Sequence, residues 1–134
     1  NKDILFLIDG EARLLDDQDN KKITIAKLGH GSIIGLASLL SSSPCEKITV
    51  SKETSAIKFN YKVIIELYNT EIIFKEFCNN TLFPGEVLRL AKKLLNNSSR
   101  TDINTLKAFN VLYKNINLIS IENNKELNIE KHFK

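Results

Sequence analysis

The stretch that decides the fold runs from Gly31 to Leu40 and reads GSIIGLASLL. Its two glycines permit backbone angles that other residues resist, so each of them predicts a turn. Together with Gly29, they break the chain between the strand candidates that precede this stretch and those that follow it.

Short apolar runs on both sides of this stretch predict β-strands. The first run, Ile4–Ile8, ends at Asp9-Gly10, which is a turn signal. The polar run at 16–20 predicts a hairpin loop rather than a calcium loop, because it lacks the glycine and final glutamate of an EF-hand. Several short strands separated by turn residues favour an antiparallel sandwich or barrel. The strand candidates lie at 4–8, 12–14, 23–28, 48–50 and 56–59.

Helical spacing replaces the strand pattern after residue 60. Pro84 suits a first helical turn, and Thr70 is expected to cap an earlier helix. Isoleucines and leucines on both sides of Asn123-Asn124 predict a final hairpin. The chain is therefore expected to be α+β, with a β-roll over residues 1–80 and a helical segment over residues 81–134. Apolar positions at helical spacing lie at 63–67, 72–77, 87–95 and 103–113.

Composition places the chain among ordinary globular domains. It has 134 residues, 43% hydrophobic and 26% charged, with a formal net charge of +3. Cys45 and Cys78 are too few for a zinc cluster or a disulfide framework, so free thiols in the cytoplasm are expected. No apolar run approaches the ~20 residues of a membrane span. Because the chain starts at Asn1 without an initiator methionine, we expect that sequence precedes it.

The residues around the decisive stretch resemble the phosphate-binding cassette of the cyclic-nucleotide-binding domain superfamily. That family includes catabolite-activator-type transcription factors, kinase regulatory subunits and gated channels. The resemblance spans Ile4 to Phe77 and implies an antiparallel β-roll, or jelly roll, followed by α-helices. The family's leading helix and first two strands have no counterpart here, so the first strands are expected to be missing. The matching positions are Gly10, Gly31, Gly35, 37–40, Pro44 and Thr49-Val50.

The resemblance also implies a pocket at which a short helix begins near Gly35, and the unpaired N–H groups and dipole of that helix attract an anion. This sequence departs from the family's pocket at both charged anchors. In the family a Glu accepts the ribose hydroxyl and an Arg binds the cyclic phosphate. Here Leu36 takes the Glu position, and the Arg position falls on Glu46, or on Cys45 if the register slips. Lys47 is the nearby cation that would replace the arginine, as a point charge without a fork. The weak candidate ligand-binding residues are Gly35, Leu36, Ala37, Ser38, Lys47 and Thr49.

The altered anchors favour a non-catalytic regulatory, sensory or protein-docking module that does not bind cyclic AMP or cyclic GMP tightly. Ser38 lies in no Gly-x-Ser-x-Gly elbow, and His30 and His132 have no partners at metal-ligand spacing. We therefore expect no enzyme, no metal and no cofactor. Two alternatives remain open: the sensory half of a catabolite-activator-type regulator whose DNA-binding helices lie beyond Lys134, and a binder of another small anion.

The second half of the chain predicts partners. Thr81–Leu88 resembles the linker after such rolls in some cyanobacterial exporters of the peptidase-containing ABC transporter class, which implies a fused or partner effector domain. The apolar stripe within 87–95 is either core or an interface seam, and a seam would form a homodimer. Arg89, Lys92 and Lys93 are the densest basic cluster and predict a solvated surface, with no clear nucleic-acid contact.

Overall fold

The computed structural model describes residues 3–97 and 104–119. Over these residues the strands come first and most of the helices follow, as the sequence predicts. The strands are β1 (Asp3–Asp9), β2 (Ala12–Gln18), β3 (Lys21–Leu28), β4 (Ile33–Ile34), β5 (Lys47–Val50) and β6 (Ser55–Asn60). The helices are α1 (Leu36–Leu40), α2 (Tyr61–Thr70), α3 (Ile72–Asn80), α4 (Pro84–Asn96) and α5 (Thr105–Asn115).

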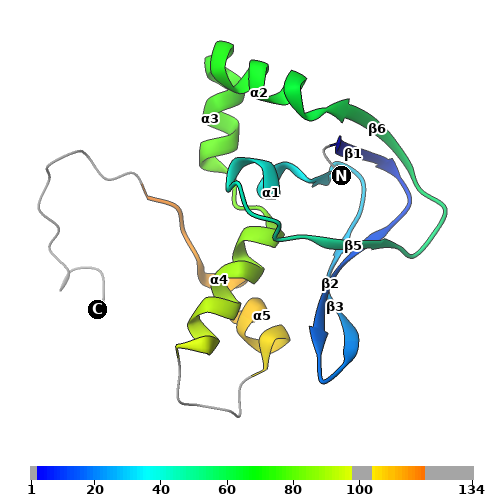
Figure 1. Ribbon diagram of the computed structural model, residues 1–134, viewed down its shortest axis with the longest axis vertical. Helices are drawn as coiled ribbons and strands as arrows, with labels where there is room; N and C mark the ends of the chain where they lie inside the picture. The colour runs from blue at the N-terminus through cyan, green and yellow to red at the C-terminus, as the bar shows by residue number, and fades with distance from the viewer. Residues whose placement is uncertain (1–2, 98–103, 120–134) are drawn as a thin grey trace, which may run out of the picture.

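The strands form two antiparallel sheets of three strands each, ordered β4-β1-β6 and β3-β2-β5. Figure 1 shows the strands on one side of the molecule and α3, α4 and α5 on the other. The predicted fold class, an antiparallel α+β roll followed by helices, is confirmed. No helix over residues 3–97 and 104–119 is long and apolar enough to span a membrane.

The turn between β1 and β2 requires a glycine at position 10. Gly10 has φ +100°, and a Cβ there would lie 2.4 Å from Thr54 Oγ1 and 2.5 Å from the Glu53 carbonyl. Glycine is required because it tolerates this angle and because a side chain would collide with the neighbouring loop. The close approach places the loop between β5 and β6 directly against the turn.

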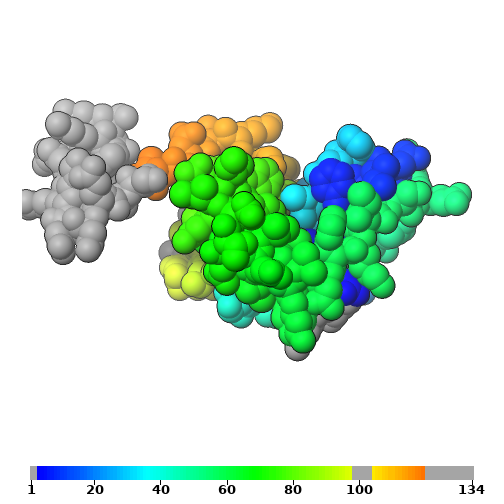
Figure 2. Space-filling view, turned by 90° about the horizontal axis from the view of Figure 1, so that it is seen from above, coloured from blue at the N-terminus to red at the C-terminus, as the bar shows by residue number. Residues whose placement is uncertain are grey.

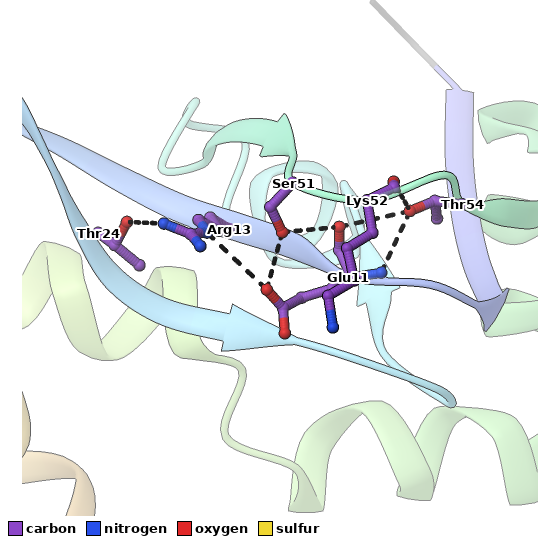
Figure 3. A network of polar contacts seen from close by, with 6 residues as sticks. All are labelled: Glu11, Arg13, Thr24, Ser51, Lys52 and Thr54. Carbon is purple, nitrogen blue, oxygen red and sulfur yellow. Dashed lines mark hydrogen bonds and ion pairs between the residues drawn. The ribbon is translucent and has the colours of Figure 1, made fainter.

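Polar contacts hold the same loop in place (Figure 3). Ser51 Oγ donates to the Glu11 carboxylate at 2.8 Å, and the Glu11 N–H donates to Thr54 Oγ1 at 3.2 Å. The hydrogen bond from Ser51 lowers the pKa of Glu11, and Arg13 lies 3.9 Å from the same carboxylate. These contacts tie the ends of β5 and β6 to the start of β2, so they help to set the register of both sheets.

The core joins the two predicted halves of the chain. Leu7 and Leu14 of the roll belong to the same buried cluster as Val87 and Leu88 of α4 and Phe109 of α5. A second cluster surrounds α1 and consists of Ile4, Leu36, Ala37, Ile64, Cys78 and Phe83. The helical segment therefore covers apolar surface of the roll, while the predicted division at residues 80/81 stays a prediction.

The helix starts agree with the sequence at one position and differ at another. Pro84 occupies the first turn of α4, as predicted. Thr70 does not cap α3: it ends α2, where its hydroxyl donates to the Glu66 carbonyl at 2.7 Å, and Glu71 takes the cap position. Helix α5 begins after Asn104, whose side chain accepts the Lys107 N–H. The hairpin predicted around Asn123-Asn124 lies outside the described residues.

Candidate functional site

Gly35 forms the turn that aims the start of α1. It follows β4, which pairs with β1, and it precedes Leu36 with φ +94°. A Cβ at this position would lie 3.0 Å from the Asp3 carbonyl and 3.2 Å from Ile4 Cδ1. The left-handed angle and the close approach both require glycine. The predicted turn and the helix start after it are confirmed.

The N–H groups at the start of α1 are bound by the chain's own Glu46. The Gly35 N–H donates to Glu46 Oε2 at 3.2 Å, and the Ser38 N–H donates to Oε1 at 3.2 Å. The Ser38 hydroxyl adds a third bond to Oε1 at 2.8 Å. A carboxylate is favoured at a helix start for the same reason as a phosphate. Glu46, at the position where the resemblance implies an arginine, therefore takes the place that an anion would occupy.

Ser38 holds this segment from a second direction. Its hydroxyl oxygen accepts the Cys45 N–H at 3.2 Å, and Cys45 Sγ lies 3.6 Å from it. Burial raises the pKa of the Cys45 thiol, while the contact with Ser38 partly opposes the shift. Cys45 is therefore a packed thiol and not an activated nucleophile. It is the Glu46 carboxylate, and not the Cys45 thiol, that accepts the N–H groups at the start of α1.

Helix α4 packs against the back of Glu46. A Cβ on Gly85 would lie 2.7 Å from Glu46 Cγ and 3.3 Å from Cys45 Sγ. The next residue, Glu86, is half-buried, and burial raises its pKa. The Glu46 charge raises it further, and Arg89 opposes both effects. The 45–46 segment is thus held between α1 on one side and α4 on the other.

The other predicted ligand-binding residues have side chains that are buried in the core or lie on the outside of the roll. Leu36 and Ala37 are each 1% exposed and pack in the core around α1, so their side chains do not face a ligand. Lys47 pairs with Asp17 of β2, and that hydrogen bond raises the pKa of Lys47. Thr49 is exposed on β5, opposite Arg13. Of the predicted set, the structure brings Gly35 and Ser38 together, and both contact Glu46.

A hollow of about 680 Å³ opens beside this junction, between β1, β4, α1, β5 and the start of α2. We call it the inner hollow. Over the described residues, its ionisable lining side chains are Asp3, Glu46 and Tyr61, and none is a lysine or an arginine. The lining of the inner hollow is therefore acidic, which disfavours an anionic ligand.

The sequence has two histidines, His30 and His132. His30 is exposed in its turn, where its Nδ1 lies 2.6 Å from the Ile8 carbonyl. His132 lies outside the described residues. Within the part of the chain that the structure describes, no group of three or more His, Cys, Asp or Glu side chains is placed to hold a metal.

The chain matches no protein-family model and no curated protein. Solved structures do resemble it. A cyclic nucleotide-binding domain from Methylobacillus flagellatus has 20% sequence identity and a TM-score of 0.49, over 90% of this chain and 61% of that one. The catabolite activator protein of Thermus thermophilus has 18% identity and a TM-score of 0.48, over 72% of this chain and 43% of that one. An EAL enzyme in its cGMP-bound form has 13% identity and a TM-score of 0.47.

This chain spans less than half of the last two proteins, with 43% of the Thermus protein and 28% of the EAL enzyme covered. The match to the EAL enzyme covers 70% of this chain. What this chain does must therefore be derived from its own residues.

Proposed function

We propose that this chain is a non-catalytic regulatory or protein-docking module whose inner hollow does not bind cyclic AMP or cyclic GMP tightly. The observation that carries the proposal is that the Glu46 carboxylate accepts hydrogen bonds from the Gly35 and Ser38 N–H groups. A cyclic phosphate would need those same donors, so it would have to displace the carboxylate. It would also approach a like charge at short range.

The rest of the inner hollow supports the same proposal. The described residues that line it include Asp3 and Glu46 but no lysine or arginine. Lys47, the predicted substitute for the family's arginine, pairs with Asp17 instead. Leu36 is buried and has no acceptor for a ribose hydroxyl. A cyclic nucleotide would therefore lose its aqueous hydration without regaining equivalent bonds.

Exposed apolar residues support the docking half of the proposal. Figure 2 shows α2 and α3 in green, together covering much of one face of the molecule. Ile72 and Ile73 are 71% and 79% exposed, and Val63, Ile65 and Phe77 are also exposed. Large apolar residues gathered on a surface are typical of protein contacts. The partner we propose is a cytoplasmic effector domain, fused or separate, such as that of an exporter.

The stripe on α4 divides between core and surface. Val87, Leu88 and Ala91 are buried, whereas Leu90 and Leu94 are 36% and 51% exposed. Only the exposed pair among these residues is free for a second copy of the chain. We propose that the chain forms a homodimer through residues 87–95. In that case Leu90→Lys/Leu94→Lys should lower the sedimentation coefficient at micromolar concentration. An unchanged coefficient would contradict the homodimer.

Calorimetry tests the main proposal. Cyclic AMP and cyclic GMP would be titrated into the purified chain, into Glu46→Arg and into the control Glu66→Arg, which makes the same charge change on exposed α2. We expect no saturable binding by the wild type or the control up to about 1 mM, and at least tenfold tighter binding by Glu46→Arg. Micromolar binding by the wild type would overturn the proposal.

The alternative effector is a DNA-binding segment. In that case the chain would be the sensory half of a catabolite-activator-type regulator, and the full gene would encode a basic recognition helix beyond Lys134. Duplex DNA binding by the full-length protein, with a steep salt dependence, would replace the exporter-type partner by this one.

A further inference from the structure

A second hollow of about 380 Å³ lies on the other side of the 44–47 segment, between β2 and α4. We call it the outer hollow. Four cationic side chains line it: Lys47 from β5, and Arg89, Lys92 and Lys93 from α4. The sequence predicts a solvated surface for the α4 cluster, and its three side chains are exposed. The structure adds a fourth cation, Lys47, from a distant part of the chain and places all four around one concavity.

The four cations differ in how they are held. Lys92 Nζ lies 2.8 Å from Asp16 Oδ1, and the Asp16 side chain is only 6% exposed. Lys47 pairs with Asp17. Within residues 3–97 and 104–119, no ion pair or side-chain hydrogen bond engages Arg89 or Lys93. Two cations are therefore anchored by carboxylates, and two have unused donors.

The carboxylates of the outer hollow do not cancel this charge. Asp16 is neutralised by Lys92 at the wall of the hollow. Glu46 also borders it, but three hydrogen bonds turn its carboxylate to the start of α1. The donors of Arg89 and Lys93 are left facing solvent. The charge available to a ligand is therefore positive.

We propose that the outer hollow binds a phosphate-bearing small molecule, with Arg89 and Lys93 as its main contacts. These two residues are four positions apart on α4 and so lie on the same face of the helix. An arginine fork matches two phosphate oxygens, and a lysine adds a point charge. The volume lies at the small end of the range of roughly 300–1,000 Å³ that ligand sites occupy, and it suits a diphosphate group. This site goes beyond the proposed function, which concerns the inner hollow.

Inorganic pyrophosphate is the first probe. It would be titrated by calorimetry into the purified chain at about 150 mM salt, where long-range attraction to exposed charge is largely screened. The test variant is Arg89→Gln/Lys93→Gln. The matched control, Lys58→Gln/Lys62→Gln, removes the same charge from exposed positions on β6 and α2. We expect saturable binding that weakens at least about tenfold in the test variant and less than about twofold in the control.

Two further measurements keep the result interpretable. Thermal unfolding is expected to give the same midpoint for both variants, because all four substituted side chains are exposed. Glu46→Gln is expected to leave pyrophosphate affinity within about threefold, since this ligand does not use the start of α1. No saturable binding, an equal loss in test and control variants, or loss in Glu46→Gln alone would overturn the proposal.

A parallel titration with ADP identifies the source of the phosphate. Tighter binding of ADP than of pyrophosphate, with the same loss in Arg89→Gln/Lys93→Gln, would assign a nucleotide. Equal affinities with that loss would assign the diphosphate group alone. ADP binding that survives in the test variant would place the ligand elsewhere and would contradict the assignment of Arg89 and Lys93.

Discussion

The inner hollow and the outer hollow both border Glu46, yet the net charges of their lining side chains are opposite in sign. The inner hollow carries Asp3 and Glu46 without a lysine or arginine among its described lining residues. The outer hollow carries Lys47, Arg89 and two further lysines. The inner hollow is therefore the less suited of the two to an anion.

The alternation of side chains along an extended segment explains the difference. Successive side chains of extended backbone point to opposite faces. Glu46 turns to the start of α1, and the next residue, Lys47, turns to Asp17 on the outer face of β2. A shift of one residue would place Lys47 or Cys45, in place of Glu46, at the start of α1. A short stretch of chain can thus determine whether a pocket is lined by positive or negative charge while the surrounding fold stays the same.

The largest expected effect comes from the contact that separates the two hollows. Gly85→Val would drive a side chain into Glu46 Cγ, which lies 2.7 Å from the position of a Cβ. Glu46 cannot move aside without losing its bonds to α1. We expect the free energy of unfolding to fall by about 3 kcal/mol, the upper part of the range for overpacked sites. Urea denaturation would measure it.

The matched control for that variant is Gly29→Val. A Cβ on Gly29 has no heavy atom within 4 Å, so the same substitution should change stability much less. Equal losses in the two variants would show that loss of glycine, and not the contact with Glu46, destabilises the chain.

The next effect distinguishes the anchored cations of the outer hollow from the unpaired ones. Lys92→Met leaves the Asp16 carboxylate, 6% exposed, without its partner. Because Lys92 itself is about half exposed, we expect a loss of about 2 kcal/mol, below the value for a fully buried pair. Lys93→Met should stay within about 0.5 kcal/mol. Thermal unfolding measures both variants.

A double-mutant cycle with Asp16→Asn tests the cause. If the unpaired carboxylate is responsible, Lys92→Met should cost much less in the Asp16→Asn background. An undiminished cost would mean that packing of the lysine stem, not the ion pair, stabilises this side of the roll.

Removing the carboxylate at the inner hollow should have a smaller effect. Glu46→Ala deletes the acceptor for the Gly35 and Ser38 N–H groups, and water can reach these groups from the hollow. We expect a loss of about 1 kcal/mol, typical of a lost helix cap. Chemical denaturation of Glu46→Ala against the exposed control Glu53→Ala checks it. A loss no greater than that of the control would mean that the three bonds add nothing to stability.

The sequence predicts the backbone around the inner hollow well because that information is local. Gly10, Gly31 and Gly35 all have positive φ, where glycine is the favoured residue. The short strand runs and the Pro84 helix start depend likewise on neighbouring residues. These signals were sufficient to predict an α+β roll with helices after it.

The role of Glu46 could not be predicted in this way. The bonds it accepts join residues 8 and 11 positions apart, and the register of the segment was open by one residue. The stripe on α4 raised a similar problem, because its pattern does not say which face meets the roll. The one available signal was chemical: a helix start that attracts a phosphate also attracts a carboxylate.

The smallest expected effect concerns Glu86, which lies beside Glu46 at the start of α4. Burial raises the pKa of Glu86, and the Glu46 charge adds to the shift. The folded chain therefore holds this proton more tightly than the unfolded chain does, so the contribution of Glu86 to stability is largest at low pH and is lost as pH rises through the folded pKa.

Glu86→Gln should stabilise the chain at pH 7, by less than about 0.5 kcal/mol because the side chain is partly exposed. The gain over wild type should shrink toward zero below about pH 4, where the wild-type carboxyl is also neutral. Thermal midpoints of both proteins across this range measure it, and a gain that grows as pH falls would contradict the burial of Glu86 beside a second carboxylate.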